Sequence, residues 1–214
     1  MKALRCVLLL ELAGMCVFAQ GQDACPKTVI AREIIRILVS SQGHKPGALL
    51  ISSDKLECKL ADAAFKGWII DRGRQVVFTT AGGDGGYENE GQQLHLYDAG
   101  TGKERQILSS LFVIDSVREL ETHVGHLALL VEMRDRGLGA SHVTIVDPRR
   151  GEVFAVQKAR VLSSEGSVLK LGFFHDGDWE TLALGKPVRP YRVRSYKIEQ
   201  LLRRQTQRKQ VLHQ

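Results

Sequence analysis

Short apolar or alternating stretches, separated by glycine-rich turns, dominate this chain from residue 61 onward. Residues 75–80, 94–97 and 104–108 have the composition of strands, and the segment DAGTG at residues 98–102 has that of a hairpin turn. Residues 126–133 form a nearly continuous apolar run, which is typical of a strand covered on both faces. The pattern predicts a mainly β protein with antiparallel pairing.

The same arrangement returns further along the chain. Residues 143–157 repeat the order strand, turn, strand, and a third unit is predicted from strands at residues 168–174, 181–184 and 191–196. Tyr97, Val146 and Tyr196 recur at intervals of about 50 residues, a period typical of propeller repeats. The sequence therefore indicates a repeated sheet unit.

Both ends of the chain are predicted to be helical. Residues 28–41 carry apolar side chains near helical spacing and predict a short helix, although their β-branched residues leave a strand open. Beyond Ser195 the apolar positions again follow helical spacing. The predicted segments are a signal peptide at 1–19, a helix and strand at 20–60, a repeat domain at 61–195 and a basic helix or tail at 196–214.

Part of the first unit carries a recognisable motif. Trp68 is followed by Asp71 and Gly73, then by a strand with apolar residues at alternate positions, and the next strand ends in LYDAGTG at residues 96–102. Residues 65–108 thereby resemble one repeat of the WD-like β-propeller proteins, the kind found in periplasmic Tol-associated proteins. The resemblance implies antiparallel propeller-like repeats, and the candidate units counted along the chain give three to four blades.

Closure of a propeller ring needs about four blades or more. A chain of this length therefore leaves three architectures open: an incomplete or four-bladed propeller, a ring completed by further copies, and an open β-sandwich.

The first nineteen residues have the features of a secretory signal peptide. Lys2 and Arg5 precede an apolar run, and small or compact residues occupy the cleavage positions before Gln20. Lipid attachment at Cys16 is the disfavoured alternative, because Met15 is not the small residue that a lipobox requires. The expected location is secreted or periplasmic. In such a compartment, Cys25 and Cys58 are candidates for a disulfide, the alternative being two separate thiols.

The formal charge of +6 is concentrated at the C-terminus. From Arg189 onward, a single acid, Glu199, is present among many basic residues. We expect either a solvated helix or contact with an anionic envelope surface, which makes this tail the predicted place of any membrane contact. Nucleic acid is not an expected partner of an exported chain.

A loop at residues 81–91 is the candidate ligand loop. It is rich in glycine, and its ligand candidates are Asp84, Tyr87, Glu88, Asn89 and Glu90. The oxygens of Asp84, Glu88 and Glu90 make a weak Ca²⁺ candidate, since calcium takes several oxygen ligands. The alternative is a plain connection between two strands, and no other cofactor is expected.

No motif supplies a catalytic site. His123 and His126 are three positions apart, a spacing that in a strand would send them to opposite faces. The segment His175-Asp176-Gly177-Asp178 is predicted to be a turn, so no zinc site is assigned. A nucleophile elbow and a Cys-x-x-Cys pair are both missing from the sequence.

The expected function is an exported β-rich binding or scaffold module, with another envelope protein or a second copy as partner. The alternative is an envelope hydrolase, or an accessory domain of one, with a carboxylate or metal site that the sequence does not locate. Whether the chain is an enzyme stays open, with no catalytic activity as the expectation.

Overall fold

The computed structural model describes residue 25 and residues 33–42, 45–54, 56–82, 90–120, 122, 127–137 and 139–203. In this part of the chain, fourteen β-strands form four antiparallel sheets, each built from strands that follow one another in the sequence. The mainly β, antiparallel fold predicted from the sequence is therefore confirmed.

The strands have the following bounds. The first sheet contains β1 (Arg36–Val39), β2 (Gly47–Ser53) and β3 (Leu56–Ala64). The second contains β4 (Lys66–Ile70), β5 (Gln75–Ala81), β6 (Gly91–Asp98) and β7 (Lys103–Ser109). The third contains β8 (Val113–Leu120), β9 (Ala128–Arg134), β10 (Ser141–Asp147) and β11 (Gly151–Val156). The fourth contains β12 (Ala159–Glu165), β13 (Val168–Phe173) and β14 (Arg192–Lys197).

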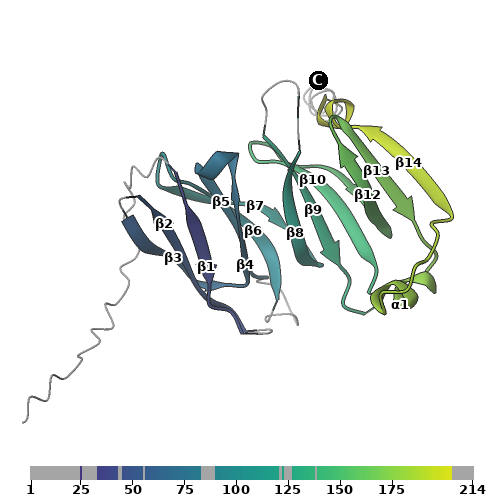
Figure 1. The fold of residues 1–214 in the computed structure, drawn as a ribbon, viewed down its shortest axis with the longest axis horizontal. Helices are drawn as coiled ribbons and strands as arrows, with labels where there is room; N and C mark the ends of the chain where they lie inside the picture. Colours follow the sequence, from purple (N-terminus) through teal and green to yellow (C-terminus); the bar gives the residue numbers. More distant parts are fainter. Residues whose placement is uncertain are drawn as a thin grey trace, which may run out of the picture.

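The sheets follow one another along the long axis of the molecule (Figure 1). β1 and β3 of the first sheet lie against β4 and β5 of the second, β4 and β6 lie against β8 of the third, and β10 lies against β12 of the fourth. The first and fourth sheets consequently occupy opposite ends of the molecule (Figure 1). Apolar cores fill the spaces between neighbouring sheets.

β9 is covered on both faces, as its apolar run predicted. Leu129, Val131 and Met133 belong to the core shared with the second sheet, whereas Ala128 and Leu130 belong to the core shared with the fourth. Successive side chains of a strand point to opposite faces, so a strand between two cores is apolar at almost every position. The prediction of a central strand is confirmed for the described residues.

The predicted hairpin turn after β6 is present. The Asp98 carboxylate accepts hydrogen bonds from the Thr101 N–H (2.8 Å) and the Gln75 side-chain amide (3.1 Å). Burial by itself would raise the pKa of Asp98, but these hydrogen bonds and those from the Thr101 hydroxyl and the Gly100 N–H outweigh burial and lower it. The corresponding turn between β10 and β11 again begins with an aspartate, Asp147.

The helix predicted at residues 28–41 is wrong for its described part. β1 lies there and pairs with β2, with Ile37 opposite Ile51 and Leu38 opposite Leu50. Ile37 packs toward the core and Leu38 is exposed, which is the alternation of a strand at the end of the molecule. The β-branched residues favour this extended conformation once a neighbouring strand is available for pairing.

A second correction concerns residues 181–184, which were predicted as a strand. Most of them belong to the helix α1 (Asp178–Ala183), which buries Trp179 and half-buries Leu182. These two residues are three positions apart, and that spacing puts both on one helical face. In place of the strand predicted at residues 181–184, the fourth sheet contains β12, which the sequence pattern did not predict.

The first sheet is tied to residue 25 by a disulfide between Cys25 and Cys58. The Cys25 N–H also donates a hydrogen bond to the Lys59 carbonyl oxygen at 2.8 Å. β3 runs continuously across the boundary predicted at residues 60 and 61, so the first sheet includes residues of the predicted repeat domain. The predicted signal peptide and Cys16 lie outside the described residues.

The C-terminal helix is confirmed for residues 198–203, while the rest of the predicted tail lies outside the described part. Ile198, Leu201 and Leu202 are buried in the core of the third and fourth sheets, as their helical spacing predicted. No helix among the described residues is long and apolar enough to cross a membrane.

Candidate functional site

A cleft of about 350 Å³ opens between the third sheet, β12 and α1. Its polar lining consists of Asp115, Ser116, Glu132, Arg134, Ser141 and Arg160. Its other lining residues are Gly139 and the apolar Met133, Trp179, Leu182 and Ala183. The volume is at the lower end of the range of small-molecule sites.

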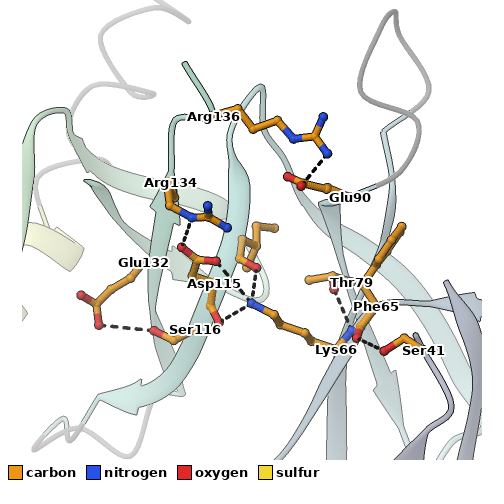
Figure 2. A network of polar contacts seen from close by, with 11 residues as sticks. Ser41, Phe65, Lys66, Thr79, Glu90, Asp115, Ser116, Glu132, Arg134 and Arg136 are labelled. Carbon is orange, nitrogen blue, oxygen red and sulfur yellow. Dashed lines mark hydrogen bonds and ion pairs between the residues drawn. The ribbon is translucent and has the colours of Figure 1, made fainter. Parts of the chain in front are cut away.

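Asp115 is the centre of a polar network that joins the second sheet to the third (Figure 2). Its Oδ2 accepts a hydrogen bond from Arg134 Nε at 3.1 Å, and its Oδ1 lies 3.3 Å from Lys66 Nζ. Lys66 also donates to the Asp115 carbonyl oxygen at 3.0 Å. A cation from β4 thus donates a hydrogen bond to a backbone carbonyl on the edge of β8 that pairs with no other strand. Both carboxylate oxygens of Asp115 also have cationic partners.

The backbone explains where Asp115 sits. β8 pairs with β9 through Ile114 opposite Met133 and Ser116 opposite Glu132, with a register shift between Ile114 and Ser116. Such an irregularity leaves one residue without a cross-strand partner and redirects its side chain. Asp115 is that residue, and it lines the cleft.

Glu132, the other carboxylate in the cleft, is also paired. Its Oε1 accepts hydrogen bonds from Arg118 Nη2 at 2.7 Å and from the Ser116 hydroxyl at 3.3 Å. Together with the Asp115 contacts, these pairs neutralise both acids of the cleft. Arg160, on β12, makes no ion pair with any described residue and leaves the cleft with an unbalanced positive charge.

The apolar side of the cleft comes mainly from α1. Trp179 is 1% exposed and packs edge-on against Phe174, with ring centroids 5.4 Å apart. Among the described residues, its indole N–H has no hydrogen-bond acceptor. Leu182 lies beside it on the same helical face and lines the cleft.

A second, smaller cleft of about 170 Å³ shares Arg134 with the first. Phe112 and Gln92 lie on its walls, and Arg136 forms an ion pair with Glu90 at 2.5 Å (Figure 2). Phe112 is stacked on His142, with ring centroids 3.7 Å apart. The two clefts therefore adjoin at Arg134, and each has both polar and apolar walls.

His142 is a buried histidine without a hydrogen-bond partner among the described residues for either ring nitrogen. Burial lowers its pKa below the ordinary value of 6.5, and Lys158 acts in the same direction, while Asp135 acts against them. The neutral ring is therefore the form that packs under Phe112.

This burial predicts a loss of stability in mild acid. Below pH 6.5, His142 is protonated in the unfolded chain but not in the folded protein. The free energy of unfolding therefore falls with the pH, until the pH reaches the pKa of His142 in the folded protein. The slope from this one group is at most about 1.4 kcal/mol per pH unit. We expect the urea midpoint of His142→Phe to vary less than the parent's between pH 7.5 and 5.5. The urea midpoint of the exposed-site variant His175→Gln should vary with pH as the parent's does. Equal pH dependence in both variants would contradict the interpretation.

Most of the ligand and histidine candidates predicted from the sequence fall outside the described part of the chain. Asp84, Tyr87, Glu88 and Asn89, and with them most of the calcium candidate, lie outside the described residues. Glu90 is described, is buried and pairs with Arg136. The histidines at 123 and 126 also lie outside the described part.

The predicted turn at residues 175–178 is described and uses its polar groups locally. His175 stacks on Tyr191, Asp176 pairs with Lys158 at 2.7 Å, and Asp178 accepts a hydrogen bond from the His175 N–H at 2.9 Å. Within the described part of the chain, no three His, Cys, Asp or Glu residues are grouped to hold a metal ion.

Sequence reasoning missed the cleft residues. The available signal was Glu132 and Arg134, two charges at alternate positions of an otherwise apolar strand, which put them on one face. Arg160 and Trp179 offered no signal, because α1 and β12 bring them to the cleft only in the folded chain.

No protein-family model matches this chain, and no curated protein matches it.

Proposed function

We propose that this chain is an exported β-rich binding module that holds a ligand with a carboxylate and an apolar body in the cleft between the third and fourth sheets. The observation that carries the proposal is Arg160, the charged residue of the cleft lining that has no ion pair among the described residues. A guanidinium presents a planar set of donors that matches a carboxylate. Met133 and Leu182 offer apolar contacts on the same cleft.

The state of the two acids supports binding over hydrolysis. Asp115 and Glu132 are each engaged by an arginine, and Asp115 is also engaged by Lys66. General acid–base chemistry needs a carboxyl group that exchanges protons with a substrate. Because Asp115 and Glu132 are paired with cations, they stabilise the walls of the cleft. Arg160 is then the charged group that attracts an anionic ligand.

We further infer that the sheets are propeller-like units in an incomplete array. Each is a series of consecutive antiparallel strands, and the first strands of adjacent sheets, β1 with β4 and β4 with β8, lie together. In propellers, blades surround a central channel. Export is supported by the Cys25–Cys58 disulfide, since such bonds persist in oxidising compartments.

Tryptophan fluorescence tests the binding proposal. The sequence has two tryptophans, so Trp68→Phe leaves Trp179, which lines the cleft, as the single reporter. We expect a pool of mixed tripeptides with free C-terminal carboxylates to shift Trp179 emission, and the same pool with amidated C-termini to leave it unchanged. Adding Arg160→Ala should weaken binding about tenfold or more, the usual effect of losing a charge-assisted hydrogen bond.

The matched control is Arg36→Ala in the same background. Arg36 is exposed and lies on the first sheet, at the other end of the molecule from the cleft (Figure 1). It should bind the free-acid pool as the parent does. Equal responses to the free and amidated pools, or full binding by the Arg160 variant, would overturn the proposal.

A further inference from the structure

The edge of the fourth sheet is unusually open. β14 is an edge strand, and residues 191–195 are all exposed. We define the β14 strip as Arg189, Tyr191, Arg192, Val193, Arg194 and Lys197. Tyr191 is 57% exposed and Val193 is 46% exposed. Successive side chains of a strand point to opposite faces, so Arg192 and Arg194 project from one face of this edge, and Val193 and Lys197 project from the other.

Among the described residues, the cations of this strip have no carboxylate partner. On the other sheets, strand arginines such as Arg36 and Arg118 lie 2.7 Å from a carboxylate oxygen. Arg192, Arg194 and Lys197 make no ion pair with any described residue. Neither β13 nor β14 contains an acid, and Lys170 adds a further exposed cation on β13.

Two further groups belong to this surface. Glu165 on β12 lies in the same cross-strand row as Val168 and Lys197, and it is the acid of the fourth sheet nearest to the strip in register. The Arg194 guanidinium lies over the Phe173 ring, 5.8 Å from its centroid. The edge therefore carries basic side chains on both of its faces, Arg192 and Arg194 on one and Lys197 on the other.

We propose that the β14 strip docks the protein on an anionic lipid surface. Because β14 is an edge strand, a membrane that meets this edge is within reach of side chains from both faces. The cations then attract anionic headgroups, while Tyr191 and Val193 supply apolar contact with the membrane interface. Charges on an edge strand disfavour pairing with another strand, so the same arginines argue against a protein partner that extends the sheet. This docking surface is independent of the cleft and of its ligand.

Vesicle co-sedimentation tests the proposal on the whole chain. One set of vesicles is phosphatidylcholine alone, and in the other about one third of the lipid is phosphatidylglycerol. We expect several-fold more protein on the anionic vesicles, and the excess should fall as salt screens the charges. Equal binding to both sets would overturn the proposal.

Matched variants separate the strip from net charge. Arg192→Gln/Arg194→Gln should lose most of the anionic excess. Arg74→Gln/Lys103→Gln removes the same charge from two exposed positions, one in the turn before β5 and one at the start of β7, and should retain the anionic excess. Circular dichroism establishes that both variants are folded. Equal losses in the two variants would make net charge the cause and would overturn the strip as the docking site.

A comparison with soluble polyglutamate distinguishes a lipid partner from an acidic protein partner. We expect Val193→Asn to weaken binding to anionic vesicles and to leave binding to soluble polyglutamate unchanged. If the parent binds polyglutamate as tightly as it binds the vesicles, the apolar residues contribute nothing. An acidic polypeptide would then replace the membrane as the partner.

Discussion

Gly47→Ala is expected to lower the free energy of unfolding by about 3 kcal/mol, the upper part of the range for overpacked sites. A Cβ at Gly47 would lie 2.4 Å from the Ser40 carbonyl carbon and 2.6 Å from the Ser41 nitrogen. Both are backbone atoms, and the Ser40 N–H is bonded to the Ala48 carbonyl oxygen at 3.1 Å. Relief of the clash therefore requires the segment that follows β1 to move away from β2. Urea denaturation followed by circular dichroism measures the loss.

Gly177→Ala is the matched control for this substitution. Gly177 has an ordinary φ of −69°, and a Cβ there would have no heavy atom within 4 Å. Its unfolding free energy should stay within about 0.5 kcal/mol of the parent's, as for most surface substitutions. Equal midpoints for the two glycine variants would show that Ser40 and Ser41 do not approach β2 as closely as the structure has it.

Loss of the Cys25–Cys58 disulfide is expected to cost about 3 kcal/mol. The bond joins residues separated by 33 positions, and a closed loop of that length restricts the unfolded chain substantially. It also holds residue 25 beside β3, where the Cys25 N–H bonds to Lys59. The first sheet, packed against the second alone, should therefore melt at lower urea concentration in Cys25→Ala/Cys58→Ala.

Reducing agent provides the control for the disulfide prediction. The parent should lose as much stability in dithiothreitol as the double variant loses without it, and the double variant should be insensitive to the reductant. A parent whose urea midpoint is unchanged by full reduction would contradict the assigned stabilisation.

The fold was predictable where local pattern and tertiary environment agree. The apolar run in β9 follows from burial on both faces, and the Asp98 turn follows from an aspartate that bonds to the N–H groups after it. The spacing of Ile198 and Leu201 likewise predicted the C-terminal helix. In each case the signal lies within a few residues of the chain.

Prediction failed where two local conformations have similar free energies. β1 carries β-branched residues at positions that also fit a helical stripe, and pairing with β2 decides between them. Residues 181–184 are too short a stretch to distinguish strand from helix, and the burial of Trp179 decides for α1. Packing energy, which the local sequence does not contain, exceeds the difference in local propensity.

By itself, the sequence determined the β-rich character of this protein, its repeated hairpins and the concentration of positive charge near the C-terminus. Tertiary structure decided the cleft, because Asp115, Arg134 and Arg160 meet across strands and sheets that are distant along the chain. It also decided which cations are neutralised, since an arginine on β9 finds a carboxylate across the sheet and those on β14 do not. Charge is a property of the sequence, whereas the pairing of charges depends on distances that only folding sets.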